Sequence, residues 1–158
     1  MLHNLDEEER IKTIITCLDH CFALGIKINE VISRLTEKRV TLEEKMIRTY
    51  FHRVAANLAE ISGCVHGKLA AAYGDEGSRL EEKTRLVVQK AGSILPLTTE
   101  LTDKLGELEK VVDDLLKVLR YDLNFLEQYY EYGLYTRLTN EQDFRQITEE
   151  LLVKLKAI

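Results

Sequence analysis

Hydrophobic residues recur along most of the chain at alternating steps of three and four, the spacing of one face of an α-helix. The most regular stretch covers residues 97–132, where acidic residues occupy much of the side opposite the apolar row. The first six residues of that row are Leu101, Leu105, Leu108, Val112, Leu115 and Leu119. We therefore predict a long helix over 97–132 that requires partner helices of similar length to cover its apolar face.

Two further long helices are predicted ahead of this one. Residues 5–38 carry a continuous apolar row that only Gly25 interrupts. Residues 41–73 begin with a capping box, in which the Thr41 hydroxyl and the Glu44 side chain each accept a backbone N–H from the other end of the first turn. Gly74 supplies the natural end of that second helix.

Small residues recur every four positions along the predicted helix 41–73 and form a ridge with almost no side chain. The ridge consists of Ala55, Ala59, Gly63, Gly67 and Ala71. Because such positions let another backbone approach closely, we predict that a neighbouring helix packs against this ridge.

Two shorter helices complete the prediction, at 79–95 and 140–157. Pro96 follows the first of them and lacks a backbone N–H, so we expect it to stop or kink the chain there. Thr139 and Gln142 form a second capping box that opens the last helix. No segment alternates apolar and polar residues with period two, so no strand is predicted.

Composition agrees with a single helical domain spanning residues 1–158. Hydrophobic residues make up 45% of the chain and charged residues 31%, and there is one proline. We predict an all-α, up-and-down bundle of four to five helices, three of them long. The acidic N-terminus does not have the pattern of a signal peptide, and no apolar run reaches the ~18 residues of a membrane span, so we expect no membrane insertion. Three cysteines, an odd number, favour a reducing, cytoplasmic location.

The net charge of −5 is concentrated in the second part of the chain. Residues 1–96 hold 14 basic and 14 acidic residues, whereas residues 97–158 hold 8 basic and 13 acidic residues. This distribution makes nucleic acid an improbable partner for the C-terminal part and favours a basic protein surface or a second subunit.

Tyrosines gather at the end of the predicted helix 97–132. Tyr129, Tyr130 and Tyr132 cannot all be buried by one helix, because consecutive residues point ~100° apart, and Tyr135 and Arg137 follow closely. Exposed aromatic residues beside an arginine are typical of interface hot spots. We predict a partner-binding corner at these five residues, the alternative being that the following turn covers them.

Cysteine and histidine residues offer a second kind of site. If helices 5–38 and 41–73 form an antiparallel hairpin, Cys17 lies level with Cys64, and His66 lies one turn away. A metal or redox site is conceivable at these three residues. The alternative is that the thiols are small hydrophobic core residues, and we expect no metal and no cofactor.

An arginine and a histidine four residues apart, Arg48 and His52, share one face of helix 41–73. Such a pair could cleave RNA, with the histidine transferring protons and the arginine stabilising charge at phosphorus. It resembles the motif of the helical HEPN ribonucleases, which has four to six residues between the two, whereas three intervene here. The alternative is a solvated basic face, which also contains Arg34, Lys38, Arg39, Lys45 and Arg53.

Other catalytic patterns are absent from the sequence. There is no Gly-rich phosphate loop, no His-Glu-x-x-His, no Glu-x-x-His and no Gly-x-Ser-x-Gly. We therefore predict a non-enzymatic protein–protein interaction module, such as an adaptor, an assembly subunit or an export-type chaperone, which binds a protein partner or self-associates. The alternative is a small helical ribonuclease or nucleic-acid accessory subunit.

Overall fold

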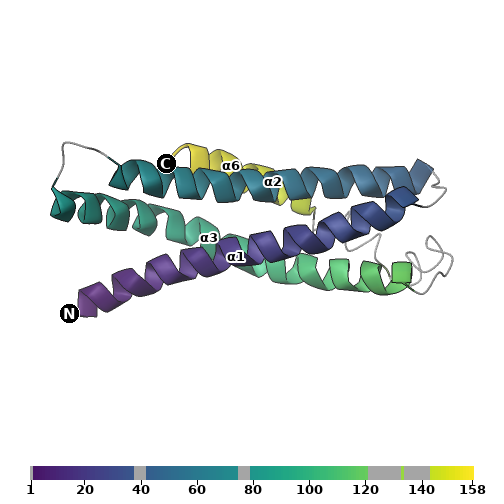
Figure 1. The fold of residues 1–158 in the computed structure, drawn as a ribbon, viewed down its shortest axis with the longest axis horizontal. Coiled ribbons are helices and arrows are strands. Elements are labelled where there is room, and N and C mark those ends of the chain that lie inside the picture. Colours follow the sequence, from purple (N-terminus) through teal and green to yellow (C-terminus); the bar gives the residue numbers. More distant parts are fainter. Residues whose placement is uncertain (1, 38–41, 75–78, 121–132, 134–142) are drawn as a thin grey trace.

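The residues that the structure describes are almost all helical (Figure 1). The structure is a computed structural model of the chain, and it describes residues 2–37, 42–74, 79–120, 133 and 143–158. The helices are α1 (Leu2–Glu37), α2 (Leu42–Tyr73), α3 (Leu80–Arg120) and α6 (Phe144–Lys156). No β-strand occurs in these residues, so the prediction of an all-α fold is confirmed.

The helices form an up-and-down bundle. α1, α2 and α3 lie side by side and alternate in direction, and α6 lies beside α2 (Figure 1). α1 contacts both α2 and α3, and α6 contacts α2 more extensively than it contacts α3. None of the described helices combines the length and the apolar composition needed to cross a membrane.

The two helices predicted at 79–95 and 97–132 are one helix in the structure. α3 is 41 residues long and passes through Pro96 without ending. The prediction of separate helices is therefore wrong, and the described part of the chain has four helices, of which α1, α2 and α3 are long. Residues 121–132 of the predicted helix lie outside the described residues.

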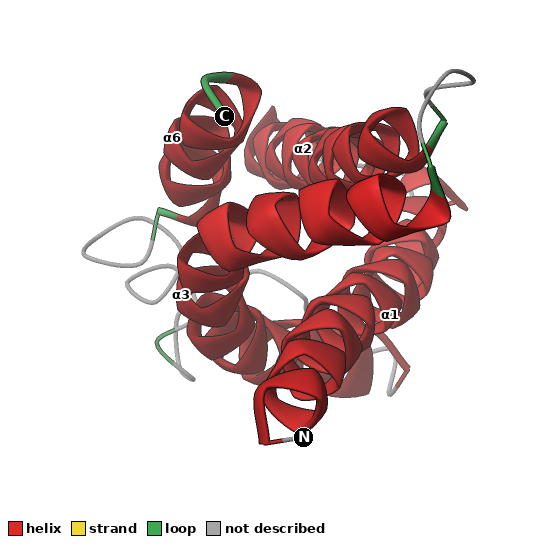
Figure 2. Cartoon of the chain, turned by 90° about the vertical axis from the view of Figure 1, so that its left-hand side faces the viewer, coloured by secondary structure: helices red, strands yellow, loops and turns green. Residues whose placement is uncertain are grey.

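α3 continues through Pro96 because both of its halves are anchored in the same core. Ala91 and Ile94 before the proline and Leu101 after it are almost completely buried. The hydroxyls of Thr98 and Thr99 each donate a hydrogen bond to the Leu95 carbonyl at 2.9 Å, beside the position where the proline supplies no N–H. The helix is bent, as Figure 2 shows: the first part of α3 slants across the molecule and the rest runs away from the viewer. A bend of this kind is the usual effect of a proline inside a helix.

The apolar row predicted for 97–132 is buried as far as the structure describes it. Leu101, Leu105, Leu108, Val112, Leu115 and Leu119 are all at most 4% exposed. α1 buries Ile14, Leu18, Cys21, Ile28, Ile32 and Leu35, which lie in the apolar row predicted for residues 5–38. It also buries Cys17, Leu24 and Val31, so its core face is wider than the predicted row.

α6 begins at Phe144, and contacts from both α6 and α2 satisfy its first backbone amides. The Asp143 carboxylate accepts a hydrogen bond from the Gln146 N–H at 3.3 Å. The Tyr50 hydroxyl, from α2, accepts a hydrogen bond from the Phe144 N–H at 3.1 Å. Such amides have no partner within their own helix, so these contacts define where α6 starts. The predicted capping box at Thr139 lies outside the described residues.

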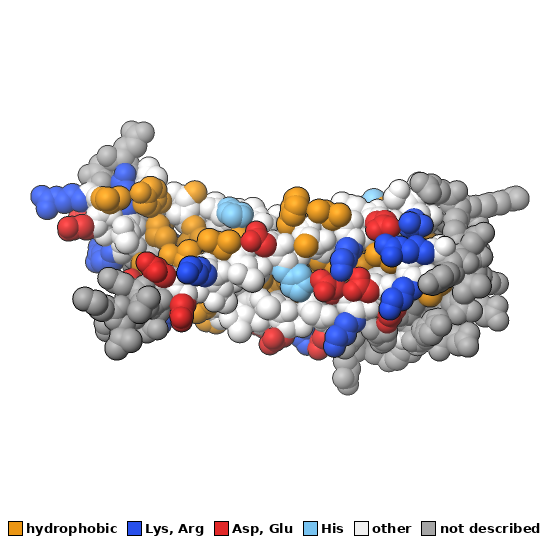
Figure 3. Space-filling view, turned by 60° about the horizontal axis from the view of Figure 1, so that its bottom comes forward, with side chains coloured by type: hydrophobic (Ala, Val, Ile, Leu, Met, Phe, Trp, Pro, Cys, Tyr) orange, Lys and Arg blue, Asp and Glu red, His pale blue; other side chains and the backbone are white. Residues whose placement is uncertain are grey.

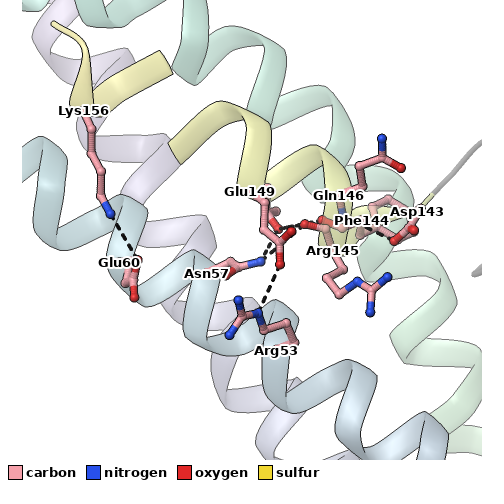
Figure 4. A network of polar contacts seen from close by, with 10 residues as sticks. Arg53, Asn57, Glu60, Asp143, Phe144, Arg145, Gln146, Glu149 and Lys156 are labelled. Carbon is pink, nitrogen blue, oxygen red and sulfur yellow. Dashed lines mark hydrogen bonds and ion pairs between the residues drawn. The ribbon is translucent and has the colours of Figure 1, made fainter. Parts of the chain in front are cut away.

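A row of polar side chains on α2 sets the position of α6 along it (Figure 4). The Asn57 side-chain amide donates to the Thr148 hydroxyl at 3.0 Å and to the Arg145 carbonyl at 3.3 Å. Arg53 pairs with Glu149 at 3.1 Å, and its hydrogen bond lowers the pKa of that carboxyl. Asn57 and Thr148 are 4% and 2% exposed, so sliding α6 along α2 would leave buried polar atoms without partners.

The ridge of small residues on α2 faces solvent for most of its length, so the predicted close packing against it is wrong. Ala59, Gly63, Gly67 and Ala71 are exposed. A Cβ atom added at Gly63 or Gly67 would meet no neighbouring atom within 4 Å. α1, α3 and α6 contact α2 on its other sides, where larger apolar side chains are buried.

We expect Gly63→Ala and Gly67→Ala each to raise the free energy of unfolding by about 0.5–1 kcal/mol, because alanine loses less backbone entropy than glycine inside a helix. Urea denaturation followed by circular dichroism measures the effect. Gly74→Ala is the matched control, since its Cβ would lie 3.1 Å from the Ala70 carbonyl oxygen and should bring no such gain. Destabilisation by either of the first two variants would contradict the exposed ridge.

Candidate interaction surface

Large apolar side chains form an exposed row on α1, on the side away from the core. Ile15, Phe22 and Ile26 are 47%, 73% and 57% exposed. Their spacings of seven and four place them on one helix face. We call this face the outer strip and define it as Ile15, Asp19, Phe22, Ile26, Asn29 and Ser33, all of which are exposed. Exposed apolar residues that recur on one helix face, here with Asp19 between Ile15 and Phe22, are a feature of surfaces that bind other proteins.

Polar and charged residues of α1 lie along one edge of the outer strip and pair there with residues of α3, and the second half of the strip itself carries no charge. His20 Nε2 lies 2.9 Å from Glu109 Oε2, and Lys27 Nζ lies 3.1 Å from Asp113 Oδ1. Further along, Arg120 of α3 reaches Glu30 at 3.5 Å. The exposed residues between 21 and 36 are Phe22, Ala23, Ile26, Asn29, Ser33 and Thr36, and none carries a charge.

Figure 3 shows this arrangement on one face of the molecule. Hydrophobic side chains lie at the surface near the middle of the view, close to a group of acidic and basic side chains. The ion pairs occupy their own edge, so a partner that covers the second half of the strip, from Phe22 to Ser33, buries no charge, whereas Asp19 lies in the first half. Burying an unpaired charge would oppose binding strongly.

The predicted tyrosine corner falls in a part of the chain that the structure does not describe. Tyr129, Tyr130, Tyr132, Tyr135 and Arg137 all lie outside the described residues. Their role in partner binding therefore stays a prediction.

The structure places Arg48 and His52 on the same face of α2. Arg48 is half-buried and His52 is exposed. Within the described part of the chain, no hydrogen bond orients the His52 ring, whereas a catalytic histidine is usually held by a partner. Two members of the surrounding basic face are paired inside the protein, since Arg34 contacts Glu30 at 3.2 Å and Arg53 contacts Glu149. Catalysis by Arg48 and His52 remains untested.

The thiols of Cys17 and Cys21 on α1 are buried in the core, and Cys17 contacts α3. The metal or redox site considered from the sequence would instead have joined Cys17 to Cys64 and His66 on α2. Cys17 Sγ donates to the Thr98 carbonyl at 3.4 Å. A hydrogen bond from the Cys21 thiol lowers the pKa of Cys17, and the same contact together with burial raises the pKa of Cys21. Cys64 on α2 is half-buried and His66 is exposed.

These positions do not assemble a metal site. In the ranges that the structure describes, no group of three or more His, Cys, Asp or Glu residues is arranged to hold a metal ion. Cys17 and Cys21 are 1% and 3% exposed, so both are small buried core residues; a weak hydrogen bond joins their thiols, and Cys17 makes a second one to the Thr98 carbonyl.

No protein-family model, no curated protein and no solved structure matches this chain. The class of the protein is therefore defined by its fold, an all-α bundle, and by the surface it exposes.

Sequence reasoning missed the outer strip. The spacing of Ile15, Phe22 and Ile26 was readable from the sequence, but two polar residues and one acidic residue complete the strip and mask its pattern. The α2–α6 polar contacts were missed for a different reason, because Tyr50 and Asn57 meet residues about 90 positions away in the chain.

Proposed function

We propose that this protein is a non-enzymatic protein–protein interaction module, of the adaptor, assembly-subunit or export-chaperone type, which binds its partner through the outer strip of α1. The single observation that supports this function is the 73% exposure of Phe22 between two other exposed apolar residues, Ile15 and Ile26. The predicted corner at 129–135 and Arg137 is a second part of the proposed partner-binding surface. Three free thiols favour a reducing compartment, and we propose the cytoplasm.

The physical case is that exposed apolar area gains free energy when a partner removes it from water. Burial contributes roughly 25 cal/mol for each Å² of apolar surface. Within the strip, Phe22 lies between Asp19 on one side and Ile26 with the uncharged half on the other. A large exposed aromatic ring is the kind of side chain that forms a binding hot spot. Ala23, next to Phe22 in the chain, is small and exposed, so a side chain of a partner helix can pack beside the ring.

The experiment is affinity capture from lysate with mass spectrometry, using the full chain as bait. Phe22→Glu places a charge at the centre of the outer strip, and we expect it to reduce the proteins retained by the unmodified bait about tenfold or more. Val153→Glu is the matched control, because Val153 lies on α6 and is 68% exposed, so the same charge change there should leave retention unchanged. The same retained set for both variants, or none above empty resin, would contradict the proposal.

A further inference from the structure

The outer strip has the spacing of a coiled-coil seam, in addition to the core seam on the opposite side of α1. Its members Ile15, Asp19, Phe22, Ile26, Asn29 and Ser33 follow one another at steps of four and three. Helices that carry a seam with this spacing pack lengthwise along one another. From Ile15 to Ser33 it runs for about 27 Å at 1.5 Å per residue.

The charges on the outer strip are unevenly placed along α1. Asp19 lies in the first half of the strip, and Lys12, one step before Ile15, extends the seam in that direction. The second half, from Phe22 to Ser33, has no charge. Two copies aligned in parallel would set Asp19 against Asp19 and Lys12 against Lys12, and like charges opposite each other are unfavourable. An antiparallel pair instead sets the charged half of each strip against the uncharged half of the other.

One antiparallel register brings the central apolar residues of the two strips together. When Phe22 of one copy lies opposite Ile26 of the other, the same contact forms twice, as two-fold symmetry requires. Asp19 then lies opposite Asn29, whose amide can donate to the carboxylate, and Ile15 lies opposite Ser33. A shift by one heptad in one direction brings Ile15 opposite Ile26 but sets the Asp19 charge against Phe22, and in the other direction it sets Phe22 against Ser33. Both shifts lose the contact between Phe22 and Ile26.

We propose that α1 pairs antiparallel with α1 of a second copy of this chain, with Phe22 of each copy packed against Ile26 of the other. This inference rests on the proposed function of the outer strip and names its partner. The ion pairs that join α1 to α3, such as Lys27 with Asp113, lie at the edge of the strip and stay intact in this arrangement.

Mass measurement in solution tests whether the pair forms through this strip. Sedimentation equilibrium of the full chain should give twice the chain mass of 18.2 kDa. Phe22→Glu should give the single-chain mass, and Val153→Glu should keep the doubled mass. Circular dichroism confirms that each variant retains its helix content, as expected at residues that are 73% and 68% exposed.

A pair of double variants tests direction and register. In the proposed register, Asp19→Lys with Asn29→Glu sets opposite charges against each other, and the dimer should dissociate no more readily than wild type. Asp19→Lys with Asn29→Lys sets like charges against each other, and the dissociation constant should rise about tenfold. In a parallel pair, both double variants would oppose like charges and weaken the dimer equally.

Three results would overturn the inference: a single-chain mass for wild type at every concentration, a doubled mass that survives Phe22→Glu, or equal weakening by both double variants. A single-chain wild type whose lysate partners are still lost with Phe22→Glu would overturn self-pairing alone and leave the proposed function standing. Loss of neither mass nor partners with Phe22→Glu would overturn both.

Discussion

Phe144→Ala is expected to lower the free energy of unfolding by about 3–5 kcal/mol, the range found when a buried phenylalanine is removed from a core. Phe144 is 1% exposed, and it is the first residue of α6. Its ring is one of the largest completely buried side chains, and the cavity left behind would lie where α6 joins the core. Because small domains are stable by only about 5–15 kcal/mol, this change would remove a large part of the total.

Phe22→Ala is the matched control, since it deletes the same atoms from a ring that is 73% exposed. We expect a change within about 0.5 kcal/mol for it. Urea denaturation at the lowest usable chain concentration gives both values and keeps the contribution of self-association small. Equal losses for the two variants would show that the assignment of Phe144 to the core and Phe22 to the surface is wrong.

Alkaline pH is expected to destabilise the protein through Tyr50. Burial, and next the Asp143 carboxylate, raise the pKa of Tyr50 to about 12 from the ordinary value of 10.0. The folded state therefore holds the phenol proton more tightly than the unfolded state does. Its contribution is complete below pH 10 and is lost as the pH rises toward 12, with a loss of about 2 kcal/mol.

Tyr50→Phe isolates this contribution, because other groups of the protein also titrate above pH 10. Between pH 9 and pH 12, the free energy of unfolding of wild type, measured relative to that of Tyr50→Phe, should fall by about 2 kcal/mol. Below pH 9 the variant should be the less stable protein, since it cannot accept the hydrogen bond from the Phe144 N–H. A difference that does not change with pH would contradict the partial burial of Tyr50 at the start of α6.

Much of the fold could be predicted because its signals are local. The apolar rows of residues 97–119 and of α1 follow the helical period, and the helix ends near Glu37 and Tyr73 lie at or within one residue of the predicted ones. Pro96 shows where local reasoning is incomplete, because the sequence left both a stop and a kink open there. A missing N–H weakens a helix at one point, but burial of Ile94 and Leu101 on either side holds the two halves in one bent helix.

The candidate site shows the same limit. α1 carries apolar residues on two faces, and its sequence does not say which face meets α2 and α3. The small ridge of α2 was expected to be packed and is exposed, whereas Ile15, Phe22 and Ile26 belonged to no predicted row and form the outer strip. The tyrosine corner stays a prediction.

Periodicity and capping act over a few residues, so they were enough to predict that this chain is helical, where α1 and α2 lie in it, and which residues of α3 face the core. Packing between distant segments is responsible for the passage of α3 through Pro96, for the contacts of Asn57 and Tyr50 that hold α6 on α2, and for the exposure of Phe22. These outcomes depend on which helix covers which face. That choice depends on the apolar surface that all the helices bury together, and no single segment of the sequence contains this information.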